Sequence, residues 1–329
     1  MPDRKTNALV LAAMIGVCVA SPVTIAADDT PVQLHVVKSS DGYEFFDGKL
    51  PILFYQAAPK SLDGEFERAG YVHPLYDLDG NVISEDFPAD HRHHRGIFWA
   101  WHQLYVGDTQ IGDPWTCRNF LSRVDNVTIA KPSSDAAAIK ATAHWVSLDW
   151  KDSSGVMKPI VREETQIEVR RSGGNHRAID FCIRLTALEA EVSIGGSDDV
   201  KGYGGFSPRL RLPEDIRFTA EYGEVAPQKT AVKASRWMDM SGSFNEEAAS
   251  QKSTISGVTV LCHPSLPEFP QKWILRKARS MQNPVFPGRT PIALSRKEPL
   301  ELRYRLIVHR SAASQDQLKR WFDEYATEE

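Results

Sequence analysis

Apolar and polar residues alternate along much of this chain with a period of two. The alternation is clearest in residues 32–37, 138–150, 164–171, 178–188, 258–263 and 300–310. In the last of these segments, Leu300, Leu302, Tyr304 and Leu306 share one face, while charged residues occupy the other. Successive side chains of a β-strand point to opposite faces, so each segment predicts a strand with one buried face.

Short polar segments separate the predicted strands. Those at residues 39–42 (SSDG), 151–155 (KDSSG), 171–175 (RSGGN) and 287–291 (PGRTP) are rich in residues that favour turns. Many short strands between such turns are typical of antiparallel sandwiches and barrels. The sequence therefore predicts an all-β fold, a large antiparallel β-sandwich of jelly-roll-like type.

Helical periodicity is convincing only near the C-terminus. Ser314 and Gln317 have the spacing of a capping box, which marks the start of a helix. The apolar residues that follow recur at helical spacing, at Leu318, Trp321, Phe322 and Tyr325. We expect a C-terminal helix that seals one edge of the sandwich, and we expect the poorly patterned residues 236–253 to form a long surface loop.

The N-terminus has the pattern of a secretory signal peptide. Arg4 and Lys5 precede an apolar stretch at 8–20, and small residues follow up to Ala27. We expect residues 1–27 to be removed and residues 28–329 to form a single β-sandwich domain, periplasmic or secreted. No later segment has the roughly 20 apolar residues of a membrane span, so we expect no integral membrane segment after processing.

Charge and cysteine content narrow the function classes. The formal net charge is −4 and the chain has no basic stripe, which argues against nucleic-acid binding. Cys117, Cys182 and Cys262 lie far apart in the sequence without C-x-x-C spacing. They allow at most one disulfide, and buried free thiols are the simpler interpretation.

The strongest chemical signal is the run PADHRHHRGIFWAWH at residues 88–102. Histidine titrates near neutral pH and ligates metals, and a core strand has no use for three of them. If the chain is extended from the start of this run, alternate residues from His91 to Trp101 share one face. The candidate residues in the run are Asp90, His91, His93, His94, Arg95, Trp99, Trp101 and His102.

Three interpretations of this run remain open. His91 and His93 could hold a divalent metal, with Asp90 or a later histidine completing the site. His91, His93 and His94 could instead act as general acid and base, while Arg95 holds a carboxylate or oxyanion. The third interpretation is a structural turn whose histidines bond to backbone groups and carboxylates.

Two later segments contribute further candidates for substrate binding. Glycines surround Tyr203 ahead of Arg209, where they permit either close approach to a ligand or a bulge in a strand. The proline-punctuated segment 261–288 carries His263, Trp273 and Arg276, and long irregular loops often carry function. Together with Trp99, Trp101 and His102, these aromatic and cationic residues suit a sugar, whose C–H face stacks on aromatic rings.

The run HPLYDLDGNVISEDFPADHRHHRGIFWAWHQL (73–104) resembles the signature of a bacterial family usually labelled "methane oxygenase PmoA-like". Residues 202–209, 263–276 and 300–310 resemble its other blocks. The resemblance implies a β-sandwich similar to the galactose-mutarotase supersandwich, in exported proteins of glycan-degrading bacteria. It does not imply methane oxidation, because the membrane subunit of methane monooxygenase is a multi-span helical protein and this chain is polar and β-patterned.

The leading functional hypothesis is an exported carbohydrate-active enzyme that processes a glycoside or an oxidised sugar. Lyase-type proton abstraction beside a carbonyl or carboxylate fits histidine and arginine better than hydrolysis does, because hydrolysis normally uses two carboxylates. Isomerisation is also compatible with these residues. The alternatives are a non-catalytic glycan-binding or accessory protein and a periplasmic metal-binding protein.

Overall fold

The computed structural model describes residues 34–131, 133, 135–171, 173–244 and 255–328. The expected signal peptide at 1–27 lies outside these residues, so its cleavage and the export of the chain stay predictions. The strands and the helix are Leu34–Lys38 (β1), Gly42–Asp47 (β2), Leu50–Gln56 (β3), Lys60–Leu62 (β4), Glu65–Arg68 (β5), Tyr71–Leu75 (β6), Ile97–Ala100 (β7), Gln103–Val106 (β8), Thr109–Gly112 (β9), Leu121–Ile129 (β10), Ala136–Lys151 (β11), Met157–Arg170 (β12), His176–Ala187 (β13), Val192–Gly195 (β14), Gly205–Pro208 (β15), Arg217–Ala220 (β16), Gly223–Glu224 (β17), Trp237–Gly242 (β18), Ser256–Cys262 (β19), Trp273–Ile274 (β20), Asn283–Pro284 (β21), Ile292–Ala293 (β22), Leu300–Arg310 (β23) and Gln315–Ala326 (α1).

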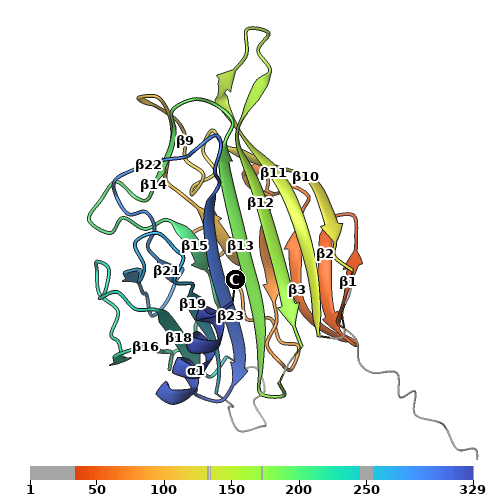
Figure 1. Ribbon diagram of the computed structural model, residues 1–329, viewed down its shortest axis with the longest axis vertical. Coiled ribbons are helices and arrows are strands. Elements are labelled where there is room, and N and C mark those ends of the chain that lie inside the picture. The colour runs from red at the N-terminus through yellow and green to blue at the C-terminus, as the bar shows by residue number, and fades with distance from the viewer. Residues whose placement is uncertain (1–33, 132, 134, 172, 245–254, 329) are drawn as a thin grey trace, which may run out of the picture. The chain divides into compact units, whose positions relative to one another are not determined.

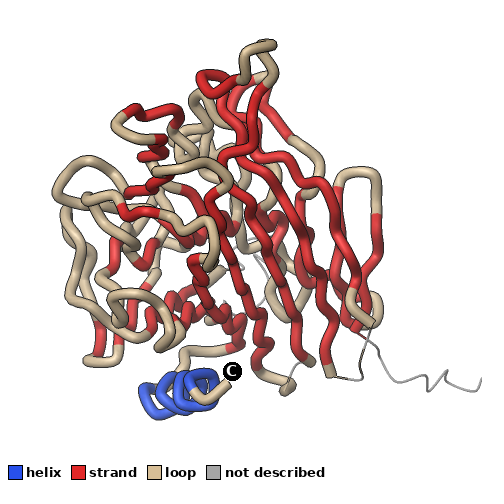
Figure 2. The backbone as a smooth tube through the Cα atoms, turned by 45° about the horizontal axis from the view of Figure 1, so that its top comes forward, coloured by secondary structure: helices blue, strands red, loops and turns tan. Residues whose placement is uncertain are grey.

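Two antiparallel sheets account for most of the strands (Figure 1). The larger has nine strands in the order β10-β11-β12-β13-β23-β19-β18-β16-β17, and the second has six in the order β1-β2-β3-β6-β7-β15. A four-stranded sheet, β22-β14-β8-β9, and two strand pairs complete the fold, while α1 is the helix of the described chain (Figure 2). The predicted all-β antiparallel sandwich is confirmed.

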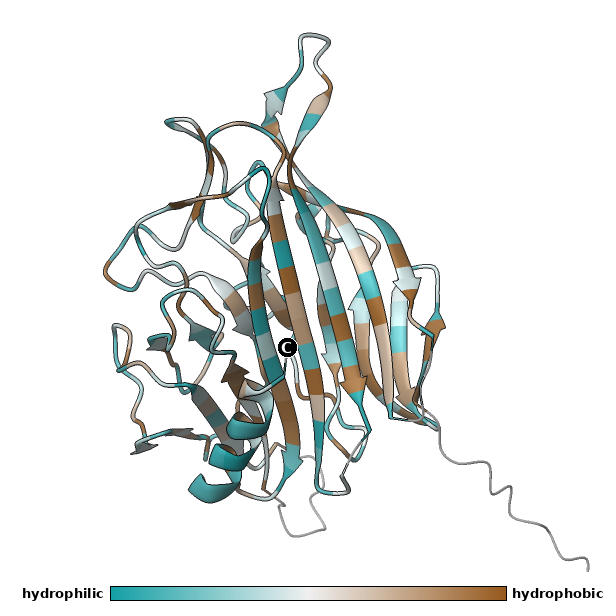
Figure 3. Ribbon diagram, viewed as in Figure 1, coloured by the Kyte–Doolittle hydropathy of each residue, from teal (hydrophilic) through white to brown (hydrophobic). Residues whose placement is uncertain are grey.

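The main hydrophobic core is built from the inward faces of the two largest sheets. Phe206 of β15 stacks on Tyr304 of β23, with ring centroids 4.5 Å apart. Phe181 of β13 lies 5.2 Å from Phe206 and 6.3 Å from Trp99 of β7. Hydropathy alternates along the strands of the nine-stranded sheet, as the period of two requires (Figure 3). Burial of these apolar faces is the dominant favourable contribution to folding.

Two buried carboxylates, Glu163 and Asp239, are satisfied by hydrogen bonds inside the protein. The buried Glu163 carboxylate accepts hydrogen bonds from Trp99 Nε1 and Trp145 Nε1, each at 2.9 Å, and burial raises its pKa. Asp239 of β18 accepts a 2.8 Å hydrogen bond from His309 Nε2 of β23. The side chains of Asp239 and His309 are each 1% exposed, so the hydrogen bond between them compensates both groups for the loss of water on burial.

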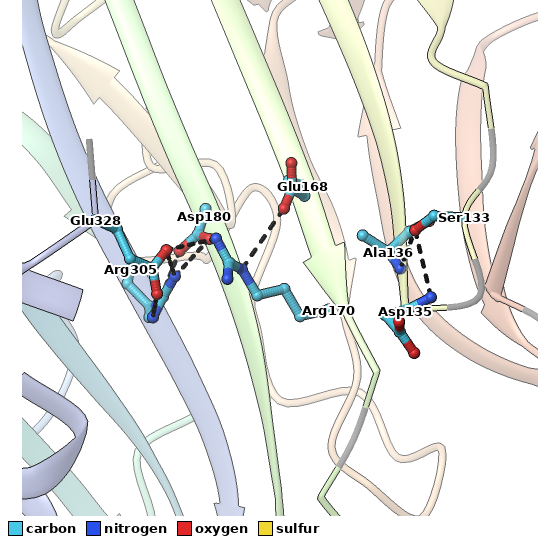
Figure 4. A network of polar contacts seen from close by, with 8 residues as sticks. All are labelled: Ser133, Asp135, Ala136, Glu168, Arg170, Asp180, Arg305 and Glu328. Atoms are coloured by element: carbon cyan, nitrogen blue, oxygen red, sulfur yellow. Dashed lines mark hydrogen bonds and ion pairs between the residues drawn. The ribbon is translucent and has the colours of Figure 1, made fainter. Parts of the chain in front are cut away.

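The outer face of the nine-stranded sheet carries a charged network (Figure 4). Arg305 Nε donates to Asp180 Oδ1 at 2.5 Å, and Arg170 Nε donates to Asp180 Oδ2 at 2.8 Å. Arg305 Nη2 also donates to Glu328, two residues beyond α1, at 2.7 Å. These contacts tie the segment after the helix to β12, β13 and β23.

The C-terminal helix begins as predicted. Ser314 is the N-cap, and its hydroxyl accepts the Gln317 N–H at 3.2 Å. The apolar face of α1 packs against Trp237, Leu261 and Ile307. These residues belong to β18, β19 and β23, so the helix covers the outer face of the sheet, and the expectation that it seals an edge is wrong. The described residues contain no helix that is long and apolar enough to cross a membrane.

One further local prediction needs correction. Within the expected surface loop at 236–253, residues Trp237–Gly242 form strand β18, and every residue of that strand is buried. Met238 and Met240 alternate there with Asp239 and Ser241, but over too few residues to stand out in a polar segment. Residues 245–253 lie outside the described part of the chain.

The described cysteines, Cys117, Cys182 and Cys262, are free thiols, as the simpler interpretation predicted, although of the three only Cys262 is buried.

The apolar run that follows the histidines, residues 96–106, is interrupted where the chain changes sheets. Residues Ile97–Ala100 form β7 in the six-stranded sheet, whereas Gln103–Val106 form β8 in the four-stranded sheet. The break falls at Trp101 and His102, which leave the strand in different directions. Trp101 is fully buried, and its Nε1 donates to the Phe286 carbonyl oxygen at 3.0 Å. His102 lies beside Trp115 and Tyr203.

Candidate functional site

Two consecutive turns between Pro88 and β7 carry the three histidines. The His91 N–H donates to the Pro88 carbonyl oxygen, and the His94 N–H donates to the His91 carbonyl oxygen. The segment is therefore not extended, and the condition under which its residues would alternate between two faces is not met. A turn can point neighbouring side chains to one place, and here His91, His93 and His94 lie together.

Gly96 fixes this segment against the six-stranded sheet. Its φ of 51° is in the left-handed region, and a Cβ would lie 2.0 Å from the Val72 carbonyl oxygen. Its N–H donates to the Glu85 carbonyl oxygen at 2.6 Å, and its own carbonyl accepts the Arg209 N–H at 2.7 Å. The histidine turns are thereby tied to the backbone next to Arg209.

The three imidazoles form one cluster. The rings of His91 and His94 are nearly parallel, at 4° and 4.7 Å between centroids. The His93 ring meets His94 edge-on at 4.7 Å and His91 at 5.7 Å. Behind them, the buried His94 contacts Phe98 and Trp115.

These histidines open onto a pocket of about 380 Å³. Its lining combines four imidazoles, two large aromatic rings, three cationic side chains and two hydroxyl groups. The polar and aromatic lining residues are His91, His93, His94, His102, Trp115, Thr116, Lys201, Tyr203, Arg276, Arg279 and Ser280. No carboxylate is among the described residues that line it.

The carboxylate of Asp90, which is not among the residues that line the pocket, orients the His91 ring. His91 Nδ1 lies 2.7 Å from Asp90 Oδ2. Arg209, which is 2% exposed, donates to both oxygens of Asp90, at 2.9 and 3.1 Å, and to Glu85 at 2.6 Å. Burial alone would raise the pKa of Asp90, but the hydrogen bonds from Arg209 and His91 lower it to about 2.

A second carboxylate orients His102 in the same way. His102 Nδ1 lies 3.1 Å from Asp113 Oδ2, and Asp113 Oδ1 accepts the Thr116 N–H at 2.9 Å. Burial by itself would raise the pKa of Asp113, but these hydrogen bonds lower it. His102 Nε2 is buried without a hydrogen-bond partner among the described residues.

The two His–Asp pairs fix which ring nitrogen is available. An ionised carboxylate accepts hydrogen bonds and does not donate, so Nδ1 of His91 and of His102 must carry the proton. In each neutral ring Nε2 then carries the lone pair that can accept a proton or a hydroxyl group, on an exposed side chain in His91 and at a buried atom in His102. The pocket therefore has two oriented imidazoles of the kind used in general acid–base catalysis.

The other two imidazoles are held neutral. Burial lowers the pKa of His94 to about 2, and the neighbouring His93, His91 and Arg209 add to the effect. Burial, with the charge of Arg68, lowers the pKa of His93 to about 4. Because His93 and His94 stay neutral, His91 is the one of the three rings that a carboxylate orients for proton transfer.

We expect these depressed pKa values to make the protein sensitive to acid. The unfolded chain binds protons at histidine near pH 6.5, whereas folded His93 and His94 resist protonation. Their contribution to stability is complete above pH 6.5 and is lost as the pH falls toward 4. Urea midpoints between pH 7 and pH 5 should fall more steeply for the parent protein than for His94→Gln. Equal slopes would contradict the neutral state assigned to His94.

Several predicted site residues lie elsewhere. Trp99, Trp101 and Trp273 are buried in the main core, so they form no stacking platform in the pocket. Their indole nitrogens bond to Glu163, Phe286 and Ser235, respectively. Strand alternation explains the difference, because Trp99 faces the sandwich interior while its neighbours Phe98 and Ala100 face Trp115.

Two further candidates serve structural contacts. Arg95 is fully buried, donates to Asp86 Oδ1 at 2.5 Å and lies over the Phe87 ring, so it holds the turns in place and does not face the pocket. His263 bonds to Ser265 and to the Glu328 carbonyl oxygen and contacts Tyr325 of α1. Of the predicted binding residues, His102, Tyr203 and Arg276 do line the pocket, and Arg209 supports it through Asp90.

The glycines around Tyr203 serve backbone packing. A Cβ on Gly202 would lie 2.9 Å from the Arg289 nitrogen, and one on Gly204 would lie 3.0 Å from the Gly196 Cα. The neighbouring backbone, and not a ligand, therefore requires these glycines.

The metal interpretation finds no geometric support. Among the described residues, no group of three or more His, Cys, Asp or Glu side chains is arranged to hold a metal ion. His91 Nδ1 is bonded to Asp90, and His93 meets the other rings edge-on. The divalent-metal site expected at His91 and His93 is therefore not part of the function proposed below.

Sequence reasoning missed three contributors to the pocket. Asp113 follows a glycine at a turn, a context in which aspartate is common, and nothing nearby marks it as the partner of His102. Lys201 and Arg279 lie in loops without a motif. Trp115, in the GDPWT segment, lines the pocket with a fully buried side chain, and Arg68 donates to its carbonyl oxygen at 3.1 Å.

A family model described as a family of unknown function, DUF6807, matches residues 45–323. The chain belongs to this DUF6807 family. The matched region contains every residue of the pocket, so the site lies within the DUF6807 fold and not on an appended segment. The family description assigns no activity and gives no information on the methane oxygenase or mutarotase resemblance. A search of curated proteins found no match.

Proposed function

We propose that this protein is an enzyme that processes a glycoside of an acidic or oxidised sugar by removing a proton beside its carbonyl or carboxylate group. The observation that carries this proposal is the pair of carboxylate-oriented imidazoles, His91 and His102, on one pocket. Tyr203, packed on the buried Trp115, offers an aromatic ring to a sugar, and Arg276 and Arg279 offer positive charge to its anionic group or developing enolate.

The chemistry can be written as an elimination. Nε2 of His91 takes the proton from the carbon next to the carbonyl, because the His91 side chain is 43% exposed and so reachable. The carbon–oxygen bond at the β position breaks, and the departing oxygen takes a proton from the imidazolium form of His102. The products are an unsaturated sugar and a free alcohol. His91 releases to solvent the proton that it took, and His102 regains a proton from solvent.

Hydrolysis by paired carboxylates is a poorer fit. That mechanism needs two carboxyl groups flanking the scissile bond. Asp90 and Asp113 are each engaged by a histidine behind the pocket wall, and Asp90 also pairs with Arg209. Their lowered pKa values keep them ionised, which suits orientation of imidazole and not donation of a proton.

The proposal is tested by incubating the purified protein with glycosides whose sugar carries either a ring ketone or a carboxylate and whose glycosidic oxygen lies at the β position to that group. We expect at least one to yield an unsaturated product and a free alcohol, detected by NMR, while the corresponding neutral glycosides do not react. Binding of such glycosides without turnover would contradict the enzyme and indicate a glycan-binding or accessory protein.

A further inference from the structure

A basic surface adjoins the pocket and extends beyond the residues that the proposed reaction uses. A depression of about 810 Å³ is lined by Lys201, Lys229, Arg276 and Lys277, together with Ala226, Pro227 and Gln228. It shares Lys201 and Arg276 with the pocket, so the two are contiguous. We call this depression, defined by those four cationic residues, the basic groove.

The groove is positively charged although the chain carries a net charge of −4. Among the described residues, neither the pocket nor the groove has a carboxylate in its lining. Lys201 is partly compensated, since its Nζ lies 3.0 Å from Asp199. Arg279 makes no hydrogen bond or ion pair with another described residue. Cations gathered along a depression raise the local concentration of anionic ligands.

The groove is held in place by Arg276. Its guanidinium donates to the carbonyl oxygens of Gln228 and Lys229, at 2.7 and 3.0 Å, and so joins the loop before β18 to the loop after β20. Its bonds are to neutral carbonyls, which leaves its positive charge uncancelled. Lys229 and Lys277 are exposed on the two joined loops, so their positions are set by the fold while their amines face solvent.

We propose that the basic groove binds further units of an anionic glycan chain, so that the substrate of the pocket is one unit of a polyanionic oligosaccharide and not a free sugar. This inference rests on the proposed function, because it places the reacting unit in the pocket. A chain leaving the pocket past Arg276 would present successive carboxylate or sulfate groups to Lys277 and Lys229. Aromatic Tyr203, with Lys201 5.4 Å from its ring centre, lies at the junction.

The test compares affinities by calorimetry at low ionic strength. The probes are galacturonic acid and its tetramer, a sulfated heparin-derived tetrasaccharide, and neutral maltotetraose. At least one anionic tetramer should bind about tenfold more tightly than galacturonic acid and maltotetraose, and the difference should shrink with added salt. The double variant Lys229→Ala/Lys277→Ala should lose about tenfold of that affinity.

The matched control is Lys140→Ala/Lys297→Ala, which removes two exposed lysines outside the groove and should bind as the parent does. Equal affinity for monomer and tetramers, or an unchanged Lys229/Lys277 variant, would overturn the inference. A single-stranded oligonucleotide that binds as tightly as the anionic tetramers would also overturn it, by showing unselective attraction of polyanions. If a small glycoside is turned over but longer anionic chains bind no more tightly, the inference about the basic groove is refuted and the proposed function stands.

Discussion

Replacing His91 by glutamine is expected to lower kcat on the glycoside substrate by about 10²- to 10⁴-fold, the usual contribution of a positioned general base. Glutamine retains a polar side chain but has no lone pair that takes a proton at neutral pH. His91 is 43% exposed on the turn, so the fold should tolerate the change. The measurement is steady-state kinetics with circular dichroism as the check on folding.

The neighbouring arginine provides a matched control. Arg92 is exposed, adjacent in sequence and absent from the pocket lining, so Arg92→Gln should keep kcat within about twofold. The limb of the pH–rate profile that reports the base should disappear in His91→Gln and persist in Arg92→Gln. Equal losses in the two variants, or full activity in His91→Gln, would contradict the role of His91.

Replacing Asp239 by alanine is expected to destabilise the protein by about 3–5 kcal/mol, the cost of leaving a buried charged partner uncompensated. Asp239 accepts hydrogen bonds from His309 at 2.8 Å and from Thr259 at 2.7 Å, and it also accepts one from Ser241. The variant therefore leaves three buried polar groups without their acceptor. The measurement is the free energy of unfolding in urea.

The chain offers a solvent-exposed pair of the same chemistry for comparison. Asp125 Oδ2 lies 2.5 Å from His144 Nδ1, with side chains 49% and 33% exposed. Exposed ion pairs contribute about 1 kcal/mol or less, so Asp125→Ala should change the free energy of unfolding by no more than that. Similar effects of Asp239→Ala and Asp125→Ala would contradict the importance assigned to burial.

The cost of losing Asp239 should also depend on pH. Burial by itself would lower the pKa of His309, but the hydrogen bond and charge of Asp239 outweigh it and the pKa is raised. A raised folded pKa contributes stability that is complete below the unfolded value of about 6.5 and is lost as the pH rises through the folded pKa. The difference in the free energy of unfolding between the parent protein and Asp239→Ala should therefore be largest in acid and should shrink above neutral pH. A difference that grows with pH would refute this assignment.

The strands were predictable because alternation is a local signal. A strand with one buried face shows its period of two in its own residues, and β11, β12, β13, β19 and β23 were all recognised in this way. Strand β18 was not, because its alternation covers only a few residues inside a polar segment. The break between β7 and β8 was also missed, since a continuous apolar run does not reveal where a chain passes from one sheet to another.

The part of the site made by residues that are neighbours in the sequence was also predictable, whereas the part that the fold assembles was not. His91, His93 and His94 are neighbours in sequence and lie together in the pocket. The pairing of His102 with Asp113 spans 11 residues and depends on where β8 and β9 are placed. Trp99 and Trp273 appeared suitable for stacking on a sugar, but their burial depends on which face of the sandwich each strand presents.

The most direct test of the central claim is exchange of the abstracted proton with solvent. A reactive keto- or carboxy-glycoside, incubated with the protein in D₂O and followed by NMR, should gain deuterium at the carbon next to its carbonyl in the glycoside that has not yet been eliminated, because elimination leaves that carbon without a hydrogen. His91→Gln should abolish that exchange, while Arg92→Gln should leave it unchanged. Product formation with no deuterium at that carbon in the remaining substrate, and undiminished in His91→Gln, would contradict proton abstraction by the oriented imidazole.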